Sequence, residues 1–571
     1  IGRVSKGLRI TTAGPKADIY VFTGSVLENM EEYTALTGKP LLPPAWVFEP
    51  WAGGGVGRWM DGPTHDVIQE MEGVIRKFKN LDIPHSGLYA EGAGWKWEDH
   101  YNKEEIYKIA AFTKQQKMRV FSWQFSHLDM EQAKELLPNC AEEDLPITRT
   151  PDYHGEKVLP CAIDFSHPRA EELLENQWHD RMDAGFDGTM VDFGEIIPDE
   201  AVFYDGRTGD EMHNAYALDY TKAYRKLFEK YKGEDHVLFS RSAAAGVQKY
   251  SCQFGGDQLS SFRGLTYAMN GGLTLAASGF PFWGVDAGGY SGFADEETYL
   301  RWTEFATFSP IMRFHGVTPR EPWAYSRYAV SVYKFYAWLR ENLLKYSVHT
   351  AEEAHKTGIP MMRPLPMVFP EDKEAVYWED EYFYGSDLLV APVHQEGEKR
   401  RIYFPSGSWI NLLDFRKMVG GNRIFQVDVP IDKIPVYIRE GACILSVMNG
   451  ELQLGQSMTY EKKNTVLMSR ALNETSGKRY ADGKKIEYNN LGKTGEDFFM
   501  LRHAFETEFI VLLGFDRKPE SLELNGVSLS EGASLNALNY GSGWYWREDT
   551  AVVVSVPKLE KTEIHVIHKE Q

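Results

Sequence analysis

The sequence predicts an α/β fold: a (β/α)₈ TIM barrel followed by two C-terminal β-sandwich domains. Between residues 46 and 345, β-rich runs alternate with helical stretches, which is typical of repeated strand–helix units. After residue 355, strand-like runs separated by turn signals dominate and favour antiparallel sandwiches. The chain has 571 residues, and because one hydrophobic core stops growing near ~250–300 residues, several domains are expected.

Eight short β-rich runs supply the strands expected for the barrel. They cover residues 46–51, 85–92, 119–125, 189–194, 236–241, 250–257, 281–286 and 311–316. Helical stretches lie between most of them, for example at residues 64–81 and 214–232. The number and spacing of these runs fit a closed barrel. An open, doubly wound parallel sheet is the alternative that the pattern alone leaves open.

The expected domain boundaries follow from changes in this pattern. Residues 1–40 are expected to be the end of an N-terminal β-sandwich and its linker, with a strand at 17–24 and a helix at 27–38. We place the barrel at 41–350, a proximal C-terminal sandwich at 351–446 and a distal one at 447–571. The strand-like runs behind the last two are 388–393, 400–412, 434–445, 508–515 and 551–557.

Charge and cysteine content exclude several classes of function. The net charge is −20 and the pI about 5.4, whereas nucleic-acid binding and anionic membrane surfaces need clustered positive charge. No apolar run reaches the ~18 residues of a transmembrane helix. The four cysteines form no CxxC pair, so zinc and iron–sulfur sites are not expected. Scattered thiols favour a reducing, cytoplasmic location, but the chain begins with Ile1, which leaves a secreted or periplasmic one open.

Polar residues at the ends of the predicted strands indicate the chemistry. Active sites of (β/α)₈ barrels lie at the C-terminal ends of the strands. The strand-end residues here are Glu91, Asp192, Glu195, Arg241, Asp257, Asp286 and His315. Carboxylates stabilise a positive oxocarbenium-like transition state, and one acid must protonate the leaving oxygen, so the set favours glycoside hydrolysis. This chemistry needs no metal, nucleotide or redox cofactor. A single strand-end Asp can equally be a helix cap, so position alone assigns no role.

Several long motifs occur in an order that resembles glycoside hydrolase family 31. "DGTMVDFGEIIPDEAVFYDGRTGDEMHNAYALDY" (187–220) resembles that family's nucleophile region, and "VLFSRSAAAGVQKYSCQFGGDQLSSF" (237–262) its acid/base segment. Further similar blocks are 278–292, 301–316, 320–325, 358–365 and 384–393. The likeness covers essentially the whole chain and is most specific between 187 and 325. It implies a retaining α-glycosidase of the α-xylosidase/α-glucosidase-like branch.

The resemblance assigns roles to individual residues. Asp192 of "VDFGE" matches the nucleophile, and Asp257 of "GGDQ" matches the general acid/base. The other residues expected to bind substrate are Glu91, Trp123, Glu195, Arg241, Gln258, Trp283, Asp286 and His315. For Trp283 a place in the barrel core is the equal alternative. Arg241 is expected to keep one carboxylate ionised, although the sequence does not say which.

Departures from the family pattern limit what the resemblance implies about the sugar. Glu91 stands where an Asp is usual, Met190 replaces a Trp or Lys, and Gln258 replaces an Asn or Cys. The expected activity is exo-acting hydrolysis of an α-linked glucose or xylose from a small oligosaccharide. Specificity for galactose, N-acetylgalactosamine or sulfoquinovose stays open, as do α-transglycosylation, a non-catalytic sugar-binding role, homo-oligomerisation and an N-terminal β-sandwich on a longer chain.

Overall fold

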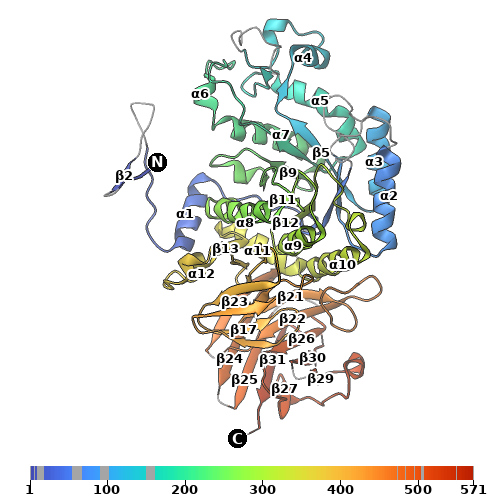
Figure 1. Cartoon of the computed structure of the whole chain (residues 1–571), viewed down its shortest axis with the longest axis vertical. Helices are drawn as coiled ribbons and strands as arrows, with labels where there is room; N and C mark the ends of the chain where they lie inside the picture. Colours follow the sequence, from blue (N-terminus) through green and yellow to red (C-terminus); the bar gives the residue numbers. More distant parts are fainter. Residues whose placement is uncertain are drawn as a thin grey trace.

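The computed structural model describes most of the chain. The described residues are 2–4, 7–9, 18–54, 67–90, 102–149, 161–471, 473–481, 484–493, 495–502, 507–547, 550–557 and 559–569. Within them the chain forms a barrel, drawn at the top of Figure 1, with a block of antiparallel sheets packed beneath it. Among these residues, no helix combines the length and the apolar character that crossing a membrane requires.

Eight parallel strands close the predicted barrel in chain order, with the last pairing with the first. They are β3 (Trp51–Gly54), β4 (Gly87–Ala90), β5 (Arg119–Phe125), β8 (Gly188–Asp192), β9 (Val237–Ser240), β10 (Cys252–Phe254), β11 (Trp283–Ala287) and β12 (Ile311–Phe314). The expectation for 46–51 was wrong in detail. Residues Ala45–Phe48 form a 3₁₀ helix, and the strand begins only at Trp51.

An outer layer of helices covers the barrel (Figure 1). It comprises α2 (Val67–Asn80), α3 (Lys103–Gln115), α5 (Ala170–Ala184), α7 (Tyr216–Lys232), α8 (Phe262–Ala277), α9 (Glu296–Thr307), α10 (Arg327–Asn342) and α11 (Leu344–Thr357). Side-chain caps start several of them, as where Asn102 accepts a hydrogen bond from Glu105 N at the start of α3. Between β5 and α5, an excursion contains β6 (His127–Leu128), α4 (Met130–Leu136) and β7 (Cys161–Ala162).

The N-terminal segment departs from its expected form. Helix α1 (Val26–Thr37) matches the predicted helix and ends at Gly38, whose positive φ of 107° suits glycine. The described residues 18–24 form no strand, so that prediction was wrong. Ile19, Tyr20 and Val21 are each more than 60% exposed, and β-type residues without a pairing strand or a core stay irregular. Strands β1 (Gly2–Val4) and β2 (Gly7–Arg9) pair with each other.

The C-terminal part is built from antiparallel sheets, apart from one parallel contact between β22 and β26. The first group contains β13 (Met362–Pro364), β14 (Tyr382–Tyr384), β15 (Leu388–Val390), β20 (Val436–Arg439), β17 (Ser408–Asn411) and β18 (Lys417–Val419), plus the pair β16 (Lys399–Phe404) and β19 (Arg423–Asp428). The run at 434–445 was expected to be one strand but is two. β20 lies in this group, whereas β21 (Cys443–Met448) starts the next sheet.

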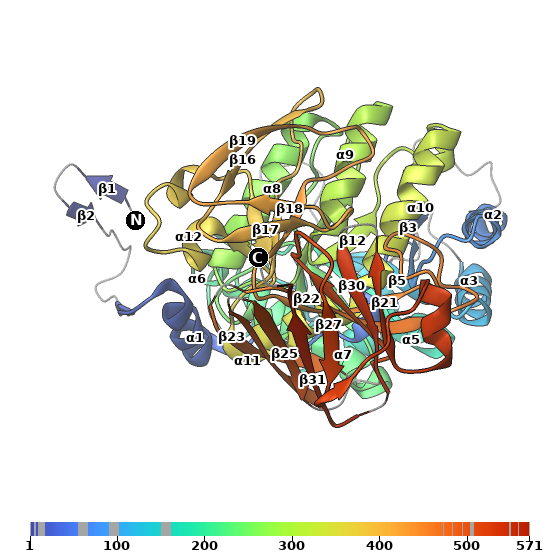
Figure 2. The ribbon, with the colours of Figure 1, turned by 90° about the horizontal axis from the view of Figure 1, so that it is seen from below.

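Two further sheets form the last sandwich, seen from below in Figure 2. One contains β21, β22 (Lys463–Ser469), β26 (Phe509–Leu513), β30 (Ala551–Ser555) and β29 (Gly543–Arg547). The other contains β23 (Thr475–Ala481), β24 (Lys484–Lys493), β25 (Glu496–Arg502), β31 (Lys561–Ile567), β27 (Ser521–Leu524) and β28 (Val527–Ser528). Their inner faces share one apolar core, which includes Ile486, Leu512 and Val566.

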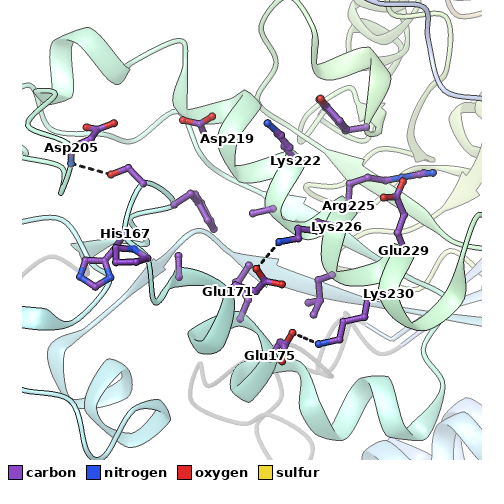
Figure 3. Close-up of a pocket in the computed structure, with 18 of the residues that line it drawn as sticks. His167, Glu171, Glu175, Asp205, Asp219, Lys222, Arg225, Lys226, Glu229 and Lys230 are labelled. Atoms are coloured by element: carbon purple, nitrogen blue, oxygen red, sulfur yellow. Dashed lines mark hydrogen bonds and ion pairs between the residues drawn. The ribbon is translucent and has the colours of Figure 1, made fainter.

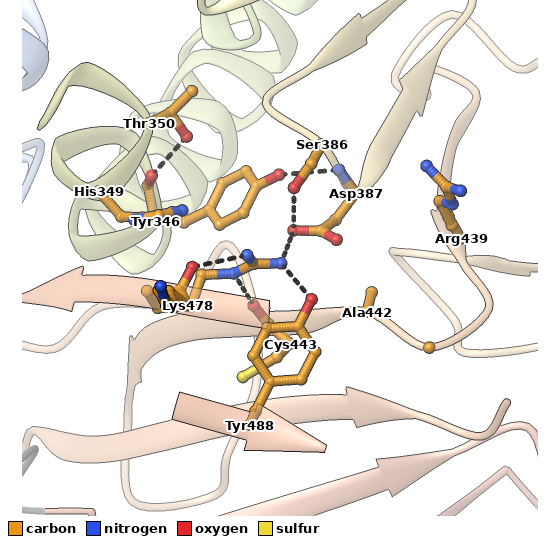
Figure 4. A network of polar contacts seen from close by, with 12 residues as sticks. Tyr346, His349, Thr350, Ser386, Asp387, Arg439, Ala442, Cys443, Lys478 and Tyr488 are labelled. Atoms are coloured by element: carbon orange, nitrogen blue, oxygen red, sulfur yellow. Dashed lines mark hydrogen bonds and ion pairs between the residues drawn. The ribbon is translucent and has the colours of Figure 1, made fainter. Parts of the chain in front are cut away.

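A buried ion pair joins these layers beneath the barrel (Figure 4). Arg479 on β23 contacts Asp387, which precedes β15, at 2.6 Å, and both side chains are 5% exposed. The guanidinium also donates to Cys443 O and to the Tyr488 hydroxyl. Tyr346 of α11 accepts a hydrogen bond from Asp387 N, so the barrel's last helix enters the same network. Every donor of a buried Arg needs such a partner. These contacts therefore fix the two sheets of the last sandwich, which contain β21 and β23, against α11.

Candidate active site

Three neighbouring barrel strands bring together the residue expected to be the nucleophile and its partners. Asp192 ends β8 and is 8% exposed. Its Oδ2 accepts a 2.8 Å hydrogen bond from Trp123 Nε1 on β5, and its Oδ1 accepts one of 2.8 Å from Phe193 N. Arg241, directly after β9, places Nη1 3.2 Å from Asp192 Oδ1. Parallel pairing of β5, β8 and β9 produces this convergence, because their carboxyl ends lie at one rim.

The backbone after β8 is shaped for this contact. Phe193 has φ of 59° and Gly194 of 91°, so both lie in the left-handed region that non-glycine residues rarely adopt. That turn aims the Phe193 N–H at the preceding carboxylate. The Arg241 guanidinium also lies 4.0 Å from the centre of the Phe193 ring, which holds this strained residue in place.

The charge state of Asp192 is set by opposing effects. Burial raises the pKa of its carboxyl, while Arg241 and the hydrogen bonds from Trp123 and Phe193 lower it; the negative charge of Glu195 raises it. Burial outweighs the three donors, so the pKa of Asp192 lies above its usual value, and the donors limit this rise by favouring the ionised form.

The negative charge of Asp192 acts on the carboxyl of Asp257, but Asp257 lacks the hydrogen-bond donors that Asp192 has. It lies three residues beyond β10 and is exposed. Burial of part of the side chain raises its pKa, the negative charge of Asp192 raises it further, and Arg241 and Arg313 lower it. No hydrogen bond to its carboxyl comes from the part of the chain that the structure describes. Asp257 is therefore the better proton donor of the pair, and Asp192 the better nucleophile.

A second carboxylate site lies deeper in the barrel. Asp286 on β11 is fully buried and forms an ion pair with Arg313, its direct neighbour on β12. Its Oδ2 has no hydrogen-bond partner among the described residues. Burial raises the pKa of Asp286 to about 7, although Arg313 opposes the shift. An unsatisfied oxygen in such a place can bind a substrate hydroxyl.

Aromatic rings surround Arg313, a residue that was not predicted from the sequence to belong to the site. Its guanidinium lies 5.1 Å from the ring centre of Tyr89 and 4.9 Å from those of Phe239 and Phe254. A signal was present in the sequence, because Arg313 lies two residues before His315 on the same predicted strand and therefore on the same side of it. A buried cation between aromatic faces needs a carboxylate partner, which Asp286 supplies.

His315, the residue directly after β12, is 4% exposed. Its ring meets the Tyr89 ring edge-on at 4.5 Å and lies 5.6 Å from that of Tyr290. Burial, together with Arg313 and Arg320, lowers its pKa well below the usual value. The imidazole is therefore neutral at neutral pH and serves as a hydrogen-bonding group, not as a charge.

The remaining predicted residues have different positions. Glu195 forms an ion pair with Arg241 at the exposed rim. The Gln258 side chain donates to Gly255 O, while its backbone carbonyl accepts hydrogen bonds from Tyr290 N (2.8 Å) and Ser291 N (3.1 Å). Gln258 thus ties the Asp257 loop to the loop after β11. Glu91 lies outside the described residues.

Trp283 does not join the other expected site residues. A Cβ on Gly272 of α8 would overlap its ring, and the ring of Phe305 in α9 lies 6.5 Å away. Trp283 is fully buried and, by strand alternation, faces opposite to Asp286 on β11. Its expected role in lining the pocket is therefore corrected to packing between the barrel and its outer helices.

A separate cavity of about 900 Å³ lies between α5 and α7 (Figure 3). None of the expected site residues lines it. Charged side chains pair across it, as in Lys226–Glu171 at 2.6 Å and Lys230–Glu175. Such a mixed, paired lining fits a solvated groove between helices better than a sugar site. Within the described ranges, no three His, Cys, Asp or Glu side chains form a group that could hold a metal ion.

Comparison with known domains matches residues 40–350 to the glycosyl hydrolases family 31 TIM-barrel domain and 358–444 to that family's C-terminal domain. Isomaltosyltransferase of Sporosarcina globispora is 27% identical over 621 residues, covering 96% of this chain and 55% of that protein. An α-xylosidase of Emericella nidulans is 29% identical over 459 residues (76% and 58%). A sulfoquinovosidase of Escherichia coli is 28% identical over 452 residues (74% and 64%).

Solved structures share the fold across the chain. The cycloalternan-forming enzyme of Listeria monocytogenes, in complex with a pentasaccharide substrate, aligns with a TM-score of 0.82 at 24% identity, covering 95% of this chain and 56% of that one. A Flavobacterium johnsoniae dextranase complexed with glucose gives 0.81 at 23% identity (96% and 74%). This chain spans less than two thirds of the length of the curated relatives named above. The domain match over more than half of its residues establishes that the chain belongs to glycosyl hydrolase family 31, a family of retaining α-glycosidases.

Proposed function

We propose that this chain carries the active site of a retaining, exo-acting α-glycoside hydrolase that removes an α-linked glucose or xylose. The observation that supports this most is the pairing of two unequal carboxyl groups at one barrel rim. Asp192 has three donors to its ionised form, whereas Asp257 feels the charge of Asp192 and has no such donors among the described residues. That inequality is what a nucleophile and an acid/base require.

In the first step, an Asp192 carboxylate oxygen attacks the anomeric carbon as the glycosidic bond breaks. Protonated Asp257 transfers its proton to the leaving oxygen, so the aglycone departs as a neutral alcohol and a β-glycosyl ester remains on Asp192. Arg241, 3.2 Å from Asp192, holds the attacking group ionised and oriented.

In the second step, the now ionised Asp257 takes a proton from a water, and the hydroxide oxygen attacks the same anomeric carbon. The ester bond to Asp192 breaks, which releases the sugar with its original α configuration and restores both groups. We expect the buried Asp286 oxygen and the neutral His315 to form hydrogen bonds with glycone hydroxyls, since Asp286 Oδ2 has no partner among the described residues.

The names of the relatives include both neutral and sulfonated sugars, so the relatives do not identify the glycone. Isomaltosyltransferase aligns over nearly the whole chain, and an α-xylosidase over three quarters of it. Transfer to a sugar instead of water is therefore the main alternative on the same site. Galactose, N-acetylgalactosamine and sulfoquinovose remain further alternatives for the glycone. A non-catalytic sugar-binding role is disfavoured because both carboxylates are present and the charge of Asp192 raises the pKa of Asp257.

A panel of 4-nitrophenyl α-glycosides tests the proposal. The glucoside and xyloside should release nitrophenol, while the galactoside, N-acetylgalactosaminide and sulfoquinovoside should react much more slowly. Proton NMR during turnover should show the α anomer of the free sugar first. The β anomer as first product, or no turnover of any member of the panel, would contradict the proposal.

A further inference from the structure

We propose that Phe293, backed by Tyr325, forms a stacking platform for the sugar unit that leaves during cleavage. This rests on the proposed function. Asp257 gives its proton to the leaving oxygen, so the leaving sugar must lie on the Asp257 side of the broken bond. The surface that adjoins the Asp257 loop is therefore where an aglycone subsite is expected.

Phe293 belongs to the loop after β11, and this loop is fastened to the Asp257 loop. Leu259 and Ser291 form a parallel bridge, and Ser260 N donates to Ser291 O at 2.9 Å. The carbonyl of Gly292, just before Phe293, accepts hydrogen bonds from Ser260 Oγ (3.2 Å), Thr318 Oγ1 (3.0 Å) and Arg320 Nη2 (3.0 Å). Three donors on one carbonyl fix the backbone that carries the Phe293 ring.

The ring itself is oriented yet open. Phe293 stacks on Tyr325 with 5.7 Å between ring centres and 29° between planes, and Tyr325 stacks on Tyr299 at 4.0 Å and 16°. Tyr299 is fully buried, while Phe293 is 61% exposed. The three stacked rings thus run from the buried Tyr299 through Tyr325 to the exposed Phe293, whose ring is open to solvent. Leu259, on the loop bridged to Ser291, is a second exposed apolar residue at 60%.

A pyranose ring is the ligand that such a face suits. Its axial C–H groups form a flat apolar side that packs on an aromatic ring, while its hydroxyls stay in water. A ring already held by Tyr325 loses little freedom on binding, which is the advantage of a preorganised site. Among the contacts named above, which join described residues, Arg320 is the only cation. It is 4% exposed, and its donors are used by backbone carbonyls and by hydroxyls. No charge is therefore offered to a ligand on the platform, which favours a neutral sugar.

Comparing substrates with and without a leaving sugar distinguishes binding of that sugar by Phe293 from a general effect of Phe293 on activity. For the glycone that the nitrophenyl panel selects, Phe293→Ala is assayed on the α-glycosyl fluoride, which has no aglycone ring, and on a disaccharide. The pairs are α-glucosyl fluoride with isomaltose, or α-xylosyl fluoride with α-xylosyl-(1→6)-glucose. We expect kcat/KM for the disaccharide to fall about three- to tenfold, mainly through KM, and that for the fluoride to stay within twofold.

Two further readouts sharpen the test. Phe293→Tyr should keep the wild-type values, because it preserves the aromatic face. With added methyl α-glucoside as acceptor, Phe293→Ala should lower the ratio of transfer product to hydrolysis product, a ratio that does not depend on enzyme concentration. Tyr377→Ala is the matched control, since Tyr377 is 77% exposed in a 3₁₀ helix (Ala375–Tyr377) that precedes β14, and its loss should change kcat/KM for neither substrate.

The outcomes distinguish this inference from the proposed function. If wild-type enzyme does not turn over the fluoride, the proposed function fails. If it does, but Phe293→Ala affects fluoride and disaccharide equally or affects neither, the platform is wrong while the hydrolase assignment stands.

Discussion

Trp123 Nε1 donates a 2.8 Å hydrogen bond to Asp192 Oδ2 across the adjacent strands β5 and β8. Both residues are buried, so this neutral donor acts where water does not compensate for its loss. It is one of three contacts that oppose the effect of burial on the Asp192 pKa.

Replacing Trp123 by Phe should therefore raise the Asp192 pKa further and reduce the ionised fraction of Asp192 at low pH. A hydrogen bond to a charged group contributes ~1.5–3 kcal/mol, so on the acidic limb of the pH profile kcat/KM should fall about 10- to 100-fold, with a much smaller change above it. Because Asp192 must be ionised, the acidic limb of the pH profile should move to higher pH. The measurement is kcat/KM against pH.

Trp283→Phe is the matched control for that variant, since Trp283 is equally buried in the barrel but packs on α8. It should lower thermal stability and leave the acidic limb in place. A shifted limb in Trp283→Phe, or an unshifted one in Trp123→Phe, would show that the hydrogen bond does not set the Asp192 pKa.

Asp286 should make stability depend on pH in an unusual direction. Its pKa is raised to about 7 in the fold from a normal value of 3.8, chiefly by burial. A group raised in this way contributes stability that is fully present below pH ~4 and is lost as pH rises through ~7. The free energy of unfolding of wild type, minus that of Asp286→Asn, should therefore fall between pH 4.5 and 7.5.

Urea unfolding of both proteins across this range measures that difference, and the slope should not exceed ~1.4 kcal/mol per pH unit for one proton. Asp414→Asn, an exposed position, should give a difference that is flat by comparison. A flat curve for Asp286→Asn, or one that rises with pH, would mean that Arg313 keeps Asp286 ionised throughout.

The Arg479–Asp387 pair should couple the C-terminal sheets to the barrel. Arg479→Met leaves Asp387 buried without its partner, which typically costs about 3–5 kcal/mol. We expect a lower Tm with unchanged kcat below the transition, because the pair lies beneath the barrel, on other elements than Asp192 and Asp257. Differential scanning calorimetry with activity assays at 20 °C tests this.

Arg416→Met provides the comparison for this loss, because Arg416 forms an exposed pair with Asp414 at 3.9 Å. It should change the free energy of unfolding by less than ~1 kcal/mol. Equal effects of the two substitutions would remove the special role assigned to the buried pair.

The sequence predicted the barrel well because its strands are short apolar runs between amphipathic helices. Residues 119–125 became β5 without any change of bounds. The prediction failed at the described residues 18–24, where β-type residues have no partner strand, and at 434–445, where one apolar run divides between two sheets. Pairing partners are not visible in local sequence, so these errors follow from tertiary context overriding local preference.

The site was predictable through motifs more than through physical pattern. The ends of the predicted strands identified Asp192, Arg241 and Asp286. Arg313 was not predicted because it lies inside a strand, and only polar residues at strand ends were taken as candidates. Trp283 was expected in the pocket, yet strand alternation puts it on the outer side of β11 from Asp286. Alternation counted along β11 from Asp286 would have placed Trp283 on the outer side, and alternation counted along β12 from His315 would have placed Arg313 on the same side as His315.

The division of roles between Asp192 and Asp257 is the centre of this account, and azide rescue tests it most directly. Asp192→Ala should lose nearly all turnover of a 4-nitrophenyl α-glycoside and regain some with azide, giving the inverted β-glycosyl azide. Asp257→Ala should keep much of its first step on this good leaving group and, with azide, give the retained α-glycosyl azide, since general-acid help worth ~10²–10⁴-fold matters least there. NMR of the azide products would contradict the assignment if both variants gave the same anomer, or if Asp192→Ala retained near-normal activity without azide.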